Sequence, residues 1–200
     1  MKRIPKALIY LRIIIGVGIL ILSLLNIDYL RAVFISLLTL GVLSDIFDGI
    51  IARRLNVSTE RLRRLDSTID QVFWILVVAS VFISFPNFFY EHSVKLLILI
   101  CAEAMTYVIS FTRFQKEVAT HAITSKVWTL FLFATLIEVI SNGNSNSLFD
   151  ICFYIGVVTR IEIILILFLL RTWTNDVPSL YHAIRLRRGK PIKRHKLFNG

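Results

Sequence analysis

Apolar residues fill six long runs of the chain, and short polar stretches separate these runs. Each run approaches the roughly 20 residues that a helix needs to cross the hydrocarbon core of a bilayer. The runs cover residues 8–25, 30–52, 69–85, 94–111, 127–140 and 148–170, and the fifth is the weakest. The pattern predicts an all-α fold, a bundle of six transmembrane helices.

The two ends of the chain differ from this pattern. Residues 1–6 mix bases with apolar side chains, which predicts a short interfacial segment before the first helix. Residues 176–188 predict a short amphipathic helix, and residues 190–196 form a polybasic run suited to anionic lipid. We therefore expect one membrane-embedded domain, residues 1–200, with a basic tail from residue 171.

Composition supports a membrane protein. The chain is 56% hydrophobic and its mean hydropathy is +0.72, which is too apolar for a soluble domain of 200 residues. The formal net charge of +10 is also found in nucleic-acid-binding proteins. With this hydropathy, the anionic inner leaflet is the expected partner and nucleic acid is not.

Loop charges predict the orientation. Most of the 23 Lys and Arg residues lie at the N-terminus, after the second run, after the fourth run, or in the tail. The opposite loops, 26–28, 86–93 and 141–147, contain none. By the positive-inside rule, both termini and the junction between the second and third runs face the cytoplasm. We expect an integral protein of a bacterial-type inner or plasma membrane.

Four carboxylates gather at that junction. Asp45 and Asp48 share one face of a helix, and Asp66 and Asp70 share a face at the start of the next. Four acids at two adjacent helix ends repel one another unless they share a cation. Ligands that are all oxygens suit Mg²⁺ or Mn²⁺. The alternative is that these acids are solvated caps or partners of neighbouring arginines.

These residues carry a family resemblance. Asp45-x2-Asp48-Gly49-x2-Ala52-Arg53, followed by Asp66-x3-Asp70, resembles the signature D-x2-D-G-x2-A-R-x8-G-x3-D-x3-D of the CDP-alcohol phosphatidyltransferases. Seven of the eight fixed positions match, and Thr59 stands where the family often has threonine. The length, the six apolar runs and the lead-in at residues 4–12 also fit the family.

Two positions depart from the family pattern. Leu62 replaces the glycine that, in the family, leaves room beside the nucleotide. Gln71 follows the last aspartate, where phosphatidylglycerophosphate synthases usually have lysine. Leu62 therefore puts the fit of cytidine in question, and Gln71 weakens an assignment to the phosphatidylglycerophosphate synthases.

The resemblance implies a transfer of the phosphatidyl group from CDP-diacylglycerol to a polar alcohol, with release of CMP. It implies that Asp45, Asp48 and Asp66 bind metal and that Asp70 is the general base and also touches metal. Two metal ions can clamp the attacking and leaving oxygens of such a transfer. We expect the nucleotide and pyrophosphate to contact Asp48, Gly49, Ala52, Arg53 and Thr59. The resemblance also implies a homodimer.

Several basic residues suggest an acceptor that bears phosphate, such as glycerol 3-phosphate or inositol phosphate. Arg160 lies within the sixth apolar run, where a charge is costly unless it faces the bundle interior or a wet cavity. Arg113 and Lys126 lie on the cytoplasmic side. We predict that these three bind the acceptor, although a buried ion pair explains Arg160 equally well.

Other functions stay open at this stage. Within the family, the product could be cardiolipin or phosphatidylserine, or the donor could be CDP-choline or CDP-ethanolamine. Intramembrane acids also mark ion transporters, although here the acids gather at one membrane face. A relative without activity that acts as a scaffold is a third alternative.

Overall fold

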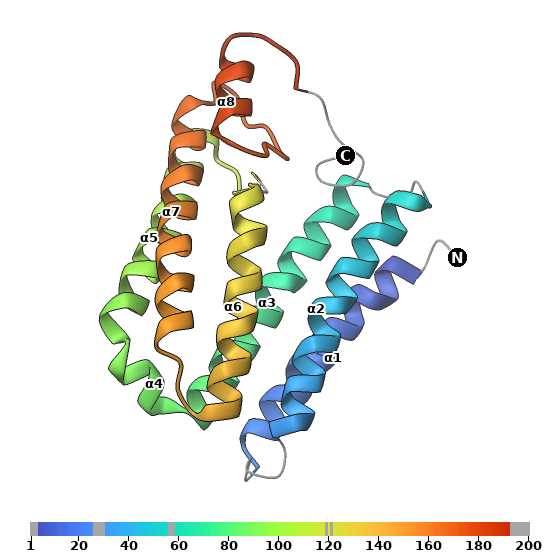
Figure 1. Cartoon of the computed structure of the whole chain (residues 1–200). Helices are drawn as coiled ribbons and strands as arrows, with labels where there is room; N and C mark the ends of the chain where they lie inside the picture. Colours follow the sequence, from blue (N-terminus) through green and yellow to red (C-terminus); the bar gives the residue numbers. More distant parts are fainter. Residues whose placement is uncertain (1–3, 26–30, 56–58, 119, 121, 193–200) are drawn as a thin grey trace. The chain divides into compact units, whose positions relative to one another are not determined.

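The structure is a computed structural model that describes residues 4–25, 31–55, 59–118, 120 and 122–192, without the side chains of Ile4, Arg53, Glu60, Arg61 and Arg63. In these ranges the regular secondary structure is α-helical (Figure 1). The helices are α1 Ile4–Ser23, α2 Arg31–Arg54, α3 Glu60–Ser84, α4 Pro86–Glu91, α5 Ser93–Phe114, α6 Ile123–Asn142, α7 Ser147–Leu169 and α8 Leu180–Arg187.

The six expected transmembrane helices are confirmed. The helices α1, α2, α3, α5, α6 and α7 are each long and apolar enough to cross a membrane. From Ile4 onward the expected interfacial lead-in is already part of α1, and residues 1–3 lie outside the described part of the chain. The amphipathic helix of the tail is present as α8, whereas most of the polybasic run after it also lies outside.

The largest differences from the expectation lie at the start of α3 and in the loop that follows it. The third apolar run begins at residue 69, but α3 begins at Glu60, because the Thr59 hydroxyl accepts a hydrogen bond from the Leu62 amide and caps the helix. The expected loop at 86–93 contains the short helix α4. Its first residue is Pro86, a residue suited to that position, and its buried Phe88 anchors it.

The chain divides into two compact units, residues 1–89 with 137–144, and residues 90–136 with 145–200. In the first unit α1 packs along both α2 and α3, whereas α2 and α3 contact each other at few points. Figure 1 shows these three long helices side by side. A side chain on the buried face of α1 can therefore reach residues of both neighbours.

One of the few contacts between α2 and α3 depends on a glycine. A Cβ atom at Gly41 would lie 2.3 Å from Cζ of Phe73, whose side chain is buried. Gly41 is one helical turn before Asp45, and Phe73 is one turn after Asp70. The contact therefore sets the separation of the two helices next to the four aspartates.

In the second unit α7 packs against α5, and α8 docks on α7. Glu162 joins three segments, because its carboxylate accepts hydrogen bonds from the Thr124 hydroxyl (2.6 Å) and from the Leu180 amide (3.1 Å). The second bond satisfies an amide of the first turn of α8, which has no partner within the helix. Glu162 thus holds the tail helix.

We expect E162A to loosen α8. A hydrogen bond to a charged group contributes about 1.5–3 kcal/mol, so its loss raises the population of undocked α8 by roughly tenfold or more. Limited trypsin digestion in nanodiscs, with mass spectrometry of cleavage after Arg185, measures this change. T124V removes only one of the two bonds and should give a smaller increase. Equal cleavage in wild type and E162A would show that other contacts hold α8.

Candidate active site

The buried face of α1 carries one charged residue in an apolar stripe. Ile9, Arg12, Ile15 and Ile19 recur at helical spacing and are all buried, and Arg12 is 0% exposed. An arginine is almost never fully buried unless it is paired. Its partners are therefore the key to this part of the protein.

Four carboxylates surround the Arg12 guanidinium. Nη1 of Arg12 lies 2.8 Å from Oδ1 of Asp45, and Nη2 forms an ion pair with Asp48. Nη1 also lies 3.3 Å from Oδ1 of Asp66 and 3.5 Å from Oδ1 of Asp70. The four aspartates that the sequence singled out are thus brought together from α2 and α3, around a side chain of α1.

The helix positions explain this convergence. Asp48 lies on the buried stripe of α2 and is 2% exposed, whereas Asp45 lies at the edge of that stripe and is partly exposed. Asp66 and Asp70 are one turn apart on α3 and are also partly exposed. The cluster therefore has a buried side at Asp48 and an accessible side formed by the other three aspartates.

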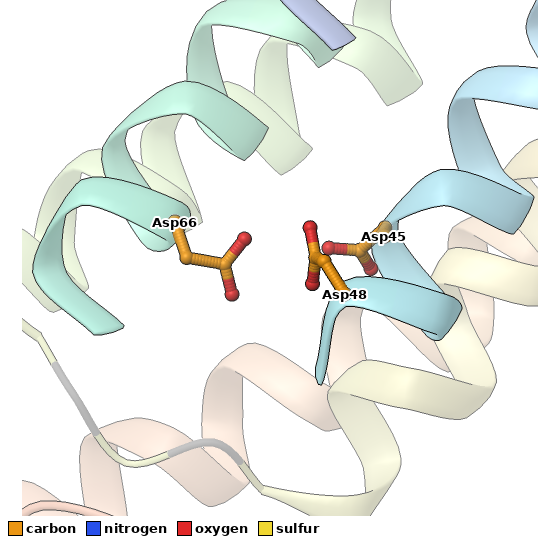
Figure 2. A group of neighbouring side chains, drawn as sticks. All are labelled: Asp45, Asp48 and Asp66. Carbon is orange, nitrogen blue, oxygen red and sulfur yellow. The ribbon is translucent and has the colours of Figure 1, made fainter. Parts of the chain in front are cut away.

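The donor atoms fit a hard divalent cation. Asp45, Asp48 and Asp66 each offer a carboxylate oxygen, and these oxygens lie within 4.8 Å of one another. Figure 2 shows Asp66 extending from α3 toward Asp45 and Asp48 of α2. A cation, the guanidinium of Arg12, already lies among these carboxylates. Clustered carboxylates of this kind are the usual protein ligands of Mg²⁺ and Mn²⁺.

The sequence left open that the four aspartates pair with neighbouring arginines. They do pair with an arginine, but it is Arg12 of α1 and not a base beside the motif. One guanidinium carries a single positive charge, whereas four aspartates can carry up to four negative charges. A structural ion pair needs one or two acids, and more acids repel one another. Convergence of four on one point is typical of a site that binds further cations.

The remaining motif residues have distinct environments. Gly49 follows Asp48 in α2, and Ala52, one turn further, is buried in a cluster with Ile9, Leu62 and Ile69. The Thr59 hydroxyl caps α3. The side chain of Arg53 lies outside the described part of the chain, and with it the prediction that Arg53 binds phosphate.

The bases predicted to bind the acceptor all belong to the second unit. Arg113 donates hydrogen bonds to the carbonyls of Leu167 (2.9 Å) and Leu170 (3.3 Å) at the end of α7. Arg160 forms an ion pair with Glu103 and stacks on the Trp128 ring, 4.3 Å from its centroid. The ion pair considered for Arg160 is therefore present.

Lys126, the third of these bases, is exposed near the start of α6.

Sequence reasoning did not identify Arg12. Its signal was present, since Arg12 is a charged residue inside the first apolar run. Intramembrane charges usually pair with one another and mark functional sites. This rule was applied to Arg160 in the sixth apolar run. The same rule, applied to Arg12 in the first run, would have indicated the four aspartates as its partners.

Comparisons with known proteins place these residues in a family context. A family model described as CDP-alcohol phosphatidyltransferase matches residues 2–168. A protein of Aquifex aeolicus (strain VF5) that carries the name "Uncharacterized protein" is 37% identical over 81 residues. That match covers 40% of each chain, so the chain spans about two fifths of the length of this relative. No solved structure gives a significant match.

Proposed function

Since the chain belongs to the CDP-alcohol phosphatidyltransferase family, we propose that it transfers the phosphatidyl group of CDP-diacylglycerol to an acceptor alcohol. The family match supports a phosphotransferase that takes a CDP-alcohol as donor and an alcohol as acceptor. Six apolar helices make it an integral membrane protein. The observation that carries the finer proposal is the convergence of Asp45, Asp48, Asp66 and Asp70 on one point.

In the proposed reaction, the acceptor hydroxyl oxygen forms a bond to the phosphorus that bears the diacylglycerol. The bond from this phosphorus to the oxygen of CMP breaks, and CMP leaves with that oxygen. Asp70 is the proposed base that takes the hydroxyl proton. Its partly exposed carboxylate lies on the accessible side of the cluster, within reach of an incoming alcohol.

The proposed cofactors are two Mg²⁺ or Mn²⁺ ions. Asp45, Asp48 and Asp66 would hold them, with Asp70 beside them. When bound, the ions neutralise the pyrophosphate and stabilise the attacking and leaving oxygens. Gly49 and Ala52, which lack bulk, let the donor approach α2, and Arg53 is proposed to fork onto a phosphate. The Thr59 hydroxyl already caps α3, so its part in nucleotide binding is to hold that helix start in place.

The proposed acceptor bears a phosphate, as glycerol 3-phosphate and inositol phosphate do. Lys126 is the proposed direct contact, because it is exposed at the start of α6. Arg113 and Arg160 are held by carbonyls and by Glu103, so each must exchange or share these partners to bind a phosphate. We further propose a homodimer, both termini in the cytoplasm, and the aspartates near the cytoplasmic face.

A panel of acceptors tests the proposal. Purified protein in nanodiscs receives CDP-diacylglycerol, Mg²⁺ or Mn²⁺, and one acceptor at a time, and the release of CMP is measured. We expect release that depends on metal and on a phosphorylated polyol. Release with serine or phosphatidylglycerol would move the protein to another branch of the family. No release with any acceptor and either metal would favour a scaffold.

The packing of Leu62 favours altered activity. Its side chain is 8% exposed and packs in the cluster of Ile9, Ala52 and Ile69, next to a motif residue expected to approach the nucleotide. The space that a glycine would leave is therefore filled by Leu62. A relative with a changed donor preference, or without activity, is the second candidate function.

Substitution of Leu62 tests whether its side chain obstructs binding of the donor. We expect L62G to lower the KM for CDP-diacylglycerol several-fold, because it opens the space beside Ala52. The same change should reduce stability by about 3 kcal/mol or more, because it removes a buried leucine and adds a helical glycine. L65G, on the same helix against the same cluster, is the matched control. An unchanged or higher KM in L62G would show that Leu62 does not obstruct the donor.

A further inference from the structure

Arg12 occupies the space that the four carboxylates enclose. Both of its Nη atoms contact aspartates, two from α2 and two from α3. Its side chain is fully buried, and among the described residues its Nε has no hydrogen-bond partner. A buried guanidinium nitrogen without an acceptor is costly. The side chain is therefore held at this place by the aspartates, and not by a complete set of hydrogen bonds.

Arg12 and a metal ion need the same oxygens. Nη1 lies 2.8 Å from Asp45, and Nη2 contacts Asp48, whereas Mg²⁺ binds carboxylate oxygens at about 2.1 Å. A divalent ion and a guanidinium about 4 Å apart repel each other by about 8 kcal/mol at an effective dielectric constant near 20. Sterics and charge therefore both disfavour an ion and the guanidinium within one set of carboxylates.

We propose that Arg12 is a built-in counter-ion that holds the four aspartates together in the metal-free protein and that metal binding displaces. This proposal rests on the proposed function, because it assumes that the cluster binds metal. In this role Arg12 is a positioning residue. It keeps α2 and α3 aligned through α1 and prevents repulsion among the clustered carboxylates from separating the helices before an ion arrives.

The proposal predicts opposite effects on stability and on metal affinity. R12Q removes the competing charge, so we expect the first Mn²⁺ to bind at least about tenfold more tightly than in wild type. The metal-free variant should unfold at a lower temperature, because the carboxylates then repel one another without compensation from Arg12. Saturating Mn²⁺ should raise the unfolding temperature more in R12Q than in wild type. A merely structural arginine would not give tighter binding when removed.

Binding is measured on the full chain in nanodiscs of zwitterionic lipid, by electron paramagnetic resonance of free Mn²⁺. K6Q removes an exposed base from the same helix and controls for a general change in charge. It should bind Mn²⁺ as wild type does. Equal or weaker binding by R12Q overturns the proposal. Wild type that binds no Mn²⁺ and releases no CMP refutes the proposed function instead.

A second measurement observes Arg12 in the wild-type protein. Arginine labelled with ¹⁵N at Nε in wild-type protein gives an NMR signal for Arg12, which is assigned with R12K. We expect Mg²⁺ to shift this signal in wild type but not in D48N. An Arg12 signal that saturating Mg²⁺ leaves in place would show that the guanidinium stays among the carboxylates, and would overturn the proposal.

Discussion

D48N should reduce metal-dependent CMP release by at least about a hundredfold. Asp48 is the most buried of the four aspartates and one of three whose oxygens lie within 4.8 Å of one another. Bound ions contribute several kcal/mol to a phosphoryl-transfer transition state, and each 1.4 kcal/mol is a factor of ten in rate. The loss of one charged ligand from the buried side removes much of this contribution.

The control for D48N is D150N. Asp150 also lies in an apolar helix and forms an ion pair, with Lys95 at 2.5 Å, but it belongs to the second unit. D150N should retain activity within a few-fold of wild type. Both variants are assayed for CMP release at saturating Mn²⁺ after their unfolding temperatures have been measured. Activity of D48N near that of wild type would show that the cluster is not the metal site of the reaction.

G41L should lower the unfolding temperature of the first unit and weaken Mn²⁺ binding at the same time. A Cβ atom at Gly41 would lie 2.3 Å from Cζ and 2.6 Å from Cε2 of the buried Phe73. Overpacking usually costs 1–3 kcal/mol, and a leucine here should cost about 3 kcal/mol or more. Because the contact lies one turn from Asp45 and from Asp70, separation of α2 from α3 also separates the metal ligands.

Two further variants make this test specific. F73A removes the ring that Gly41 faces, so G41L/F73A should be at least as stable as either single variant, a coupling that distant sites do not show. G18L adds the same side chain to α1 at a position where a new Cβ meets no atom within 4 Å. G18L should leave the unfolding temperature and the Mn²⁺ affinity unchanged. If G41L and G18L behaved alike, the contact of Gly41 with Phe73 would not control the site.

The periodicity of the chain was sufficient to predict the helices, because length and hydropathy decide which segments can span a bilayer. The spacing of Asp45, Asp48, Asp66 and Asp70 was sufficient to predict that they share two helix faces. Their meeting around one point depends on tertiary packing. The start of α3 was placed late because Thr59, a polar cap, extends the helix beyond the apolar run.

The environments of the arginines could not be deduced from spacing. Arg12, Arg113 and Arg160 are all charged residues in or beside apolar runs, and the sequence does not pair them with partners 30 to 60 positions away. The structure gives them three different environments: the aspartate cluster, the end of α7, and the Glu103–Trp128 pair. Their partners follow from which helix faces which, and that is decided by packing of whole helices.

If the carboxylates hold divalent ions and, through them, the pyrophosphate of the donor, then each bound ion lies next to phosphorus nuclei of the donor. Electron–nuclear double resonance of Mn²⁺ bound to the protein with CDP-diacylglycerol tests it directly, because it detects phosphorus nuclei next to the ion. The account predicts coupling to the phosphorus nuclei of the donor in wild type, and its loss in D48N. Bound Mn²⁺ without phosphorus coupling in wild type, at a donor concentration that supports CMP release, would contradict it.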